Sequence, residues 1–293
     1  MSVGSLTLSA ASRRRLTRAR LLNRIFTIAL WSLGILAMLP LFFIAGFVLA
    51  KGASHLNFNL FTKTPAVPGA PGGGISQAFV GSGLIVGMSV IFSVILGLGA
   101  AIYISEFGST RAASVIRFTG DVLLSTPSIV AGFLVWTLII AHWFPYSALA
   151  GSIAISLLIW PIVARASEDI LRLVPRELRD AGAALGAPKW KVVVRVVIPA
   201  ASAGLANAVL LAVARGIGET APVLLTILGS DYISVNPTHP SDTISLRIYN
   251  YARSPVSSLH DIAWAASLSL LIIVLLLSLT ARYLGARTRK AMA

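Results

Sequence analysis

Residues 177–199 read ELRDAGAALGAPKWKVVVRVVIP, and this polar, helix-capable segment interrupts a chain that is otherwise almost entirely apolar. Of the 293 residues, 56% are hydrophobic and 12% are charged, and the mean hydropathy is +0.85. A soluble domain of this length is rarely so apolar. The stretches on either side of the segment are therefore expected to lie in a membrane, and the segment itself outside it.

Six stretches are long and apolar enough to cross a hydrocarbon core of about 30 Å, which takes roughly 20 helical residues each. They lie near 25–50, 79–104, 116–141, 148–166, 200–228 and 261–282. Backbone groups cannot stay unpaired in lipid, and no stretch alternates as a barrel strand would. The sequence thus predicts an all-α, polytopic membrane protein with six transmembrane helices, and a short helix near 245–252 in the last outside loop.

The basic residues give the orientation. Most of the 24 lysines and arginines lie before the first span, in the loops after the second and fourth spans, and in the tail. The positive-inside rule then places both termini in the cytoplasm. The same rule and anionic membrane lipids account for the net charge of +14, so no nucleic acid partner is expected. We expect a basic segment at 1–24, a six-span domain at 25–282 with a cytoplasmic loop at 167–199, and a basic tail at 283–293.

The residue inventory argues against an enzyme. The chain has no cysteine, and its four histidines are scattered, so no metal site is expected. It has no Gly-Lys dipeptide and hence no phosphate-binding loop for ATP. No nucleophile–base set is visible, so no catalytic residue and no cofactor are predicted.

The 174–199 segment is predicted to form a helix–turn–helix. Pro175 suits a first helical position, and Glu177 and Asp180 complement the positive end of the helix dipole. An apolar face with small residues at its centre follows, made by Leu178, Ala181, Gly182 and Leu185. Gly186 offers a left-handed stop. Such a face suits docking by another protein, although an amphipathic helix lying on the lipid surface explains the same composition.

A second set of candidate residues lies in the fifth span. Arg215 and Glu219 are four residues apart on one predicted helical face, and charges near mid-membrane usually face a cavity or a partner. Residues that weaken the helix or add a hydroxyl surround them: Gly216, Gly218, Thr220 and Pro222. Backbone N–H groups freed there are expected to point at an anion, as in broken transporter helices. A self-satisfied pair that only fixes packing is the alternative.

The third span carries a smaller candidate set. Ser125 and Ser128 flank Pro127. Their hydroxyls either bond to carbonyls that the proline frees or line a pathway, and we favour the first.

Two motifs resemble a known family. The order Asp180-Ala181-Gly182, then Gly186, then an apolar residue before Pro199 is similar to the EAA loop of ATP-binding-cassette importer permeases, with Asp180 for the usual Glu and Gly182 for the usual Ala. The runs 215–222 and 124–132 resemble those in the permease subunits of the bacterial high-affinity phosphate importer. These subunits belong to the binding-protein-dependent transport inner-membrane component family. The runs 73–75, 103–106 and 248–250 favour its A-type permease subunit.

The resemblance implies a type I importer permease fold and a multi-pass protein of the bacterial cytoplasmic membrane. Its function would be a transmembrane channel subunit that passes phosphate to the cytoplasm. The implied partners are a second permease subunit forming a heterodimer, two ATPase subunits and an extracytoplasmic phosphate-binding protein. A permease for another oxyanion, such as sulfate or molybdate, remains an alternative. An ion-coupled secondary transporter would need no docking segment.

Overall fold

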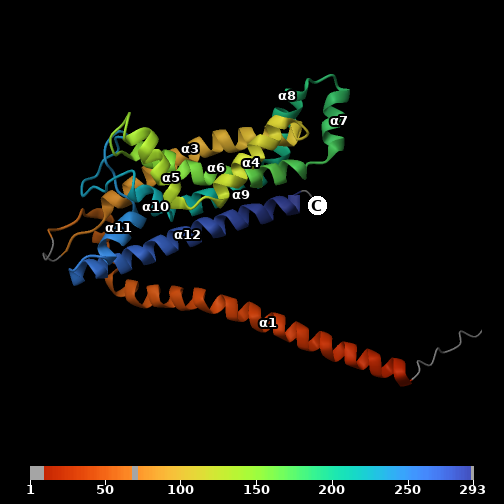
Figure 1. Cartoon of the computed structure of the whole chain (residues 1–293), viewed down its shortest axis with the longest axis horizontal. Helices are drawn as coiled ribbons and strands as arrows, with labels where there is room; N and C mark the ends of the chain where they lie inside the picture. The colour runs from red at the N-terminus through yellow and green to blue at the C-terminus, as the bar shows by residue number, and fades with distance from the viewer. Residues whose placement is uncertain (1–9, 68–71, 292–293) are drawn as a thin grey trace, which may run out of the picture. The chain divides into compact units, whose positions relative to one another are not determined.

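The computed structural model describes residues 10–67 and 72–291 as a helical protein, in which the described residues form no strand beyond one isolated bridge (Figure 1). The chain divides into two units, one ending at Ala50 and one beginning at Lys51. The first unit is most of helix α1 (Ala10–Gly52), which matches the predicted first span. Pro40 lies inside this helix, a position that transmembrane helices tolerate.

The second unit contains the other long helices. These are α3 (Ser76–Phe107), α6 (Ala148–Arg172), α9 (Ile198–Ile217) and α12 (Ser257–Ala291). Together with α1, they make five helices long and apolar enough to span a membrane among the described residues. The helical path of the fifth predicted span begins earlier than 200, because α8 (Lys189–Val192) and the π-helical turn η3 (Val193–Val197) run directly into α9. Likewise, α6 continues past 167, where we expected the cytoplasmic loop to begin.

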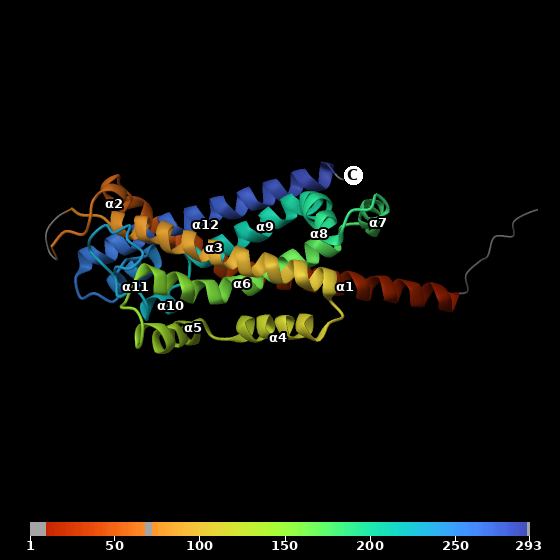
Figure 2. The ribbon, with the colours of Figure 1, turned by 90° about the horizontal axis from the view of Figure 1, so that it is seen from above.

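The third predicted span is present as a bent pair of helices and not as one continuous helix. It consists of α4 (Arg111–Ser125), α5 (Ser128–Val135) and the π-helical turn η2 (Trp136–Ile140), with a bend of 108° between the two parts. The break falls at Thr126 and Pro127, because proline lacks an N–H and pushes the residue before it out of the helical region. Thr126 is indeed extended, with ψ 130°. Figure 2 shows α4 and α5 joined by this link. A sixth span exists only if the bent pair counts as one.

Shorter helices complete the second unit. The 3-10 turn η1 (Ala53–His55) and α2 (Asn59–Thr62) precede α3, and α7 (Arg176–Ala184) stands between α6 and α8. The predicted fifth span stops at Ile217, and the separate α10 (Ala221–Leu224) follows. The expected short helix is present as α11 (Ile244–Ala252). Within this unit, α7 and α8 lie at one end of the long helices and α10 and α11 at the other (Figure 1).

Helices α3, α6 and α9 form the frame that positions both ends. Their shared core includes Ile85, Ile159 and Ala212, all buried. Helix α3 approaches α6 closely at Gly97, where an added Cβ would lie 2.8 Å from the Cβ of Val163. Small residues at helix contacts are typical of membrane proteins, where close backbone approach replaces a hydrophobic driving force.

Candidate functional site

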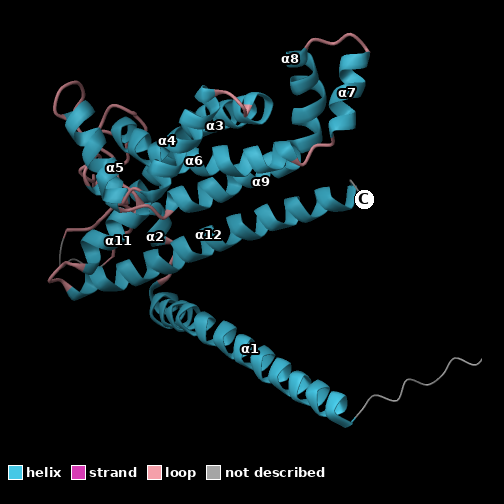
Figure 3. Cartoon of the chain, turned by 45° about the vertical axis from the view of Figure 1, so that its right-hand side comes forward, coloured by secondary structure: helices cyan, strands magenta, loops and turns pink. Residues whose placement is uncertain are grey.

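The docking segment has the predicted helix–turn–helix form. Helix α7 starts at Arg176, so Pro175 is the residue before the helix and not its first member. The helix ends at Ala184, and Gly186 adopts the left-handed conformation with φ +75°. Pro188 then precedes α8. Figure 3 shows α7 and α8 as two adjacent helices joined by a loop.

The predicted apolar face of α7 is largely exposed. Leu185 has 88% and Leu178 42% of its surface accessible, and Ala181 is also exposed. The fourth member differs, since an added Cβ on Gly182 would lie 3.0 Å from the Cγ2 of Val192 in α8. Gly182 therefore lets α7 close against α8, while the other three residues remain available to a partner. Further exposed members of the predicted set are Glu177, Asp180, Gly186 and Pro199.

A buried carboxylate holds the docking segment to the frame, and sequence reasoning missed it. The Glu106 side chain at the end of α3 is 9% exposed. Its Oε1 lies 3.1 Å from Arg179 Nη1 of α7, and its Oε2 lies 3.4 Å from Lys189 Nζ of α8. Lys189 Nζ also donates to the Glu106 carbonyl at 2.9 Å. The only sequence signal was an acid at the end of an apolar span, which by itself names no partner.

A second buried carboxylate lies at the same end of the frame but forms ion pairs with other helices. The Glu168 side chain of α6 is 5% exposed. Its Oε1 pairs with Arg117 Nη2 of α4 at 3.1 Å and with Arg172 Nη2 at 2.7 Å. This cluster connects α4 to α6 and contains no residue of α7.

The predicted pair in the fifth span is present at the break after α9. Arg215 Nη2 lies 3.5 Å from Glu219 Oε1, and the side chains are 57% and 14% exposed. The expectation that freed N–H groups point at an anion was wrong for the two residues after the helix. The N–H of Gly218 donates to Arg215 O at 3.1 Å and that of Glu219 to Gly216 O at 3.3 Å. These two N–H groups are thus bonded within the turn.

The residues around this pair have different surroundings. Gly216 is buried against α6, where an added Cβ would lie 3.4 Å from Ile155 Cγ2, so it serves close packing. Gly218 is exposed, and Thr220 Oγ1 donates to its carbonyl at 3.5 Å. The Ser245 hydroxyl of α11 donates to the Glu219 carbonyl at 2.9 Å, which fixes the break to the loop beyond it.

Ser125 ends α4 and Ser128 begins α5, and the role of their hydroxyls at the bend stays a prediction. The Ser125 hydroxyl donates to the Asp121 carbonyl at 2.9 Å, one turn earlier in α4. Ser128, half-buried, begins α5. Helix α5 packs on α10 where Gly132 meets Pro222: an added Cβ on Gly132 would lie 2.7 Å from Pro222 Cα. The bend therefore brings α5 against the segment that follows Glu219.

A buried ion-pair cluster, also missed from the sequence, stabilises the loop between α10 and α12. The Asp242 carboxylate is fully buried, and its Oδ2 accepts from Arg247 Nε at 2.5 Å and from Gln77 Nε2 of α3 at 3.3 Å. Arg247 Nη1 donates to Asp231 Oδ1 at 2.7 Å. Burial raises the pKa of Asp242 to about 6, although the charge and hydrogen bonds of Arg247 favour ionisation.

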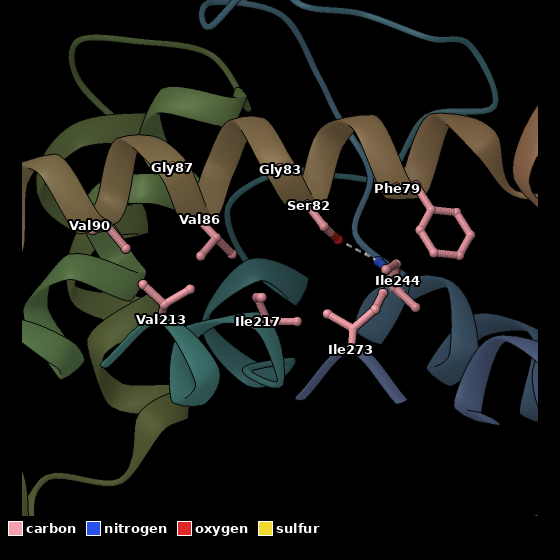
Figure 4. A pocket seen from close by; sticks show the side chains of 10 residues that line it. All are labelled: Phe79, Ser82, Gly83, Val86, Gly87, Val90, Val213, Ile217, Ile244 and Ile273. Carbon is pink, nitrogen blue, oxygen red and sulfur yellow. Dashed lines mark hydrogen bonds between the residues drawn. The ribbon is translucent and has the colours of Figure 1, made fainter. Parts of the chain in front are cut away.

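A cavity near these elements is lined mainly by apolar side chains. It has a volume of about 380 Å³ and lies between α3, α9 and α12 (Figure 4). Its lining includes Val86, Val213 and Ile273. The polar side chain in the lining is Ser82, whose hydroxyl accepts from the N–H of Ile244 at 2.9 Å. Arg215 and Glu219 do not line this cavity, so it does not provide an anion site in this conformation. The described residues contain no cluster of three or more side chains suited to a metal ion.

Comparison with known proteins places these features in context. Residues 93–290 match the model of the family described as "Binding-protein-dependent transport system inner membrane component". The chain is 37% identical over 284 residues to the phosphate transport system permease protein PstA of Yersinia pestis, which covers 97% of this chain and 96% of that protein. It is 40% identical to PstA of Xylella fastidiosa, over 83% of this chain and 85% of that one.

A further relative matches most of the chain at similar identity. PstA 1 of Mycobacterium tuberculosis is 37% identical over 93% of this chain and 91% of its own length. Among solved structures, an inward-facing form of the MetNI methionine ABC transporter aligns with TM-score 0.55 and 18% identity, over 72% of this chain and 94% of that one. Another crystal form of the same transporter aligns with TM-score 0.52. At this identity, the structural likeness establishes the fold alone.

Proposed function

The chain belongs to the family of binding-protein-dependent transport system inner membrane components, and on this premise we propose that it is the transmembrane channel subunit of an ATP-driven phosphate importer. It is an inner-membrane protein with several helices able to cross the bilayer. The observation that carries the proposal is the 37–40% identity to phosphate permeases over most of the chain. These relatives favour phosphate over sulfate or molybdate.

Helix α7 and its following turn form the proposed docking surface for an ATPase subunit. Three apolar or small side chains are exposed on one face, flanked by the exposed acids Glu177 and Asp180. Side chains left exposed in this way are suited to the apolar groove of another protein, with the flanking charges setting the register. Membership of this transporter family supports a complex in which ATP hydrolysis is carried out by other chains. The proposed complex contains two separate ATPase subunits, a second permease and an extracytoplasmic phosphate-binding protein.

The orientation follows from the ends of the second unit. The docking end carries many basic residues, including Arg176, Lys189, Lys191 and Arg195. By the positive-inside rule, this end lies in the cytoplasm and the α10–α11 end outside. The basic residues before the first span and in the tail support the proposal that both termini are cytoplasmic as well.

Arg215 and Glu219 are the proposed contacts for phosphate in transit. Arg215 is more than half exposed, so its guanidinium is accessible to an anion, which it would hold through two oxygens. Glu219 accepts hydrogen bonds and so suits the hydroxyl of hydrogen phosphate, while it repels fully ionised sulfate. A structural ion pair is the alternative, and the partial exposure of Arg215 favours the transport role.

Reconstitution tests the proposed function directly. The chain is coexpressed with its neighbouring permease and ATPase genes, purified through a tag on this chain and placed in lipid vesicles. We expect the ATPase to copurify, and ATP together with the binding protein to drive uptake of labelled phosphate but not of sulfate or molybdate. Uptake that follows an ion gradient without ATP would instead support a secondary transporter.

A further inference from the structure

Both ends of α3 make polar contacts with other segments of the second unit. At the docking end, Glu106 receives one cation from α7 and one from α8. At the other end, Gln77 and Ser82 hold the loop that leads into α11. Both sets lie on one continuous helix whose full length is 32 residues, about 48 Å at 1.5 Å per residue. One rigid element therefore contacts both the docking segment and the loop whose Ser245 bonds to the carbonyl of Glu219.

The cations that pair with Glu106 are themselves held by further contacts. Arg179 Nη2 also donates to the Leu171 carbonyl at 2.8 Å, so its guanidinium is fixed between α6 and α3. Lys189 Nζ lies 4.1 Å from the ring centroid of Phe107, next to Glu106 on the same helix. Separating Arg179 from Glu106 would leave a carboxylate with 9% exposure paired only with the more distant and more exposed Lys189, which is unfavourable. Displacement of α7 is thus expected to move α3 with it.

We propose that Glu106 is the positioning residue that couples α7 to α3, so that a push on the docking helix is carried along α3 to the break beside Glu219. The proposal rests on the proposed function, because it requires an ATPase at α7. The partners of Glu106 are not equivalent. Arg179 is 23% exposed and Lys189 is 54% exposed, so the first pair is the stronger link.

The experiment compares Glu106→Gln with a matched control in the reconstituted complex. The control is Glu168→Gln, which neutralises an equally buried carboxylate at the same end whose two arginines belong to α4 and α6. Labelled phosphate uptake and ATP hydrolysis are measured together in phosphatidylethanolamine–phosphatidylglycerol vesicles, and subunit content is checked by copurification. The readout is phosphate moved per ATP hydrolysed, which a purely structural role would not change in correctly assembled complexes.

We expect Glu106→Gln to lower this ratio by about fivefold or more, the lower end of typical coupling between distant sites, and Glu168→Gln to leave it unchanged. Arg179→Gln should reproduce the defect, and adding it to Glu106→Gln should cause no further loss, because both remove one link. Lys189→Gln should have a smaller effect. The exchanged pair, Glu106→Arg with Arg179→Glu, should recover part of the ratio.

An unchanged ratio in assembled Glu106→Gln complexes would overturn the inference, and so would equal losses in the two glutamine variants. If Glu106→Gln does not assemble, a normal ratio in Arg179→Gln would overturn it as well. A native complex that hydrolyses ATP without moving phosphate is a different result, because it contradicts the proposed function itself.

Discussion

The turn at Gly186 offers a sharp test of the docking segment. Its φ of +75° lies in the left-handed region, and an added Cβ would meet no atom within 4 Å. A side chain there has room, so the penalty of Gly186→Val comes from the backbone conformation alone. For a residue with a Cβ, the left-handed conformation costs about 1–2 kcal/mol. That reduces the population of the correctly formed turn roughly 5- to 30-fold.

The expected result is a weakened docking segment in a normally inserted protein. ATPase copurification and ATP-driven phosphate uptake should fall in Gly186→Val, while the amount of chain in the membrane stays the same. Gly186→Asn is the matched control, because asparagine tolerates the left-handed region, and it should keep most of the uptake. Full uptake and assembly in Gly186→Val would refute the reasoning that this turn places α7 for docking.

Three further predictions concern the orientation in the membrane, the pair Arg215 and Glu219, and the pH dependence of stability. Reporter fusions at Gly72 should behave as extracytoplasmic and fusions at Ala187 as cytoplasmic; the reverse at Gly72 would overturn the topology. Arg215→Gln should strongly reduce phosphate uptake, and Glu219→Gln should reduce it less and admit more sulfate; full, selective transport by the exchanged pair would rule out a direct role. The pKa of Asp242 is about 6 in the folded protein and 3.8 in the unfolded chain. The folded protein therefore binds this proton more tightly, and the stability that the proton adds is complete below about pH 4 and is lost as the pH rises through 6. Thermal unfolding in detergent from pH 4 to 7 should therefore change less steeply in Asp242→Asn, and an unchanged slope would contradict the assignment.

Local sequence signals were sufficient to predict the long apolar helices and the stop at Gly186, but not the bend at Pro127. A run of about 20 apolar residues has to be helical in lipid, so the spans could be placed from composition. Gly186 marked the end of α7, because the left-handed conformation that it adopts there is a preference of glycine itself. Gly218 marked the end of α9, where it is the cap residue. The docking role of α7 and the transport role of Arg215 stay predictions.

Only the tertiary structure decided which charges meet. Glu106 pairs with Arg179 and Lys189, more than 70 residues away, and Gln77 reaches Asp242 across 165 residues of sequence. Sequence periodicity says which face of a helix is apolar but not which neighbour lies against it. The same limit hid the 108° bend at Pro127, since a proline in a membrane helix is compatible with a mild kink or a full break. At the break, α5 packs against α10, and this contact cannot be predicted from the residues near Pro127 in the sequence.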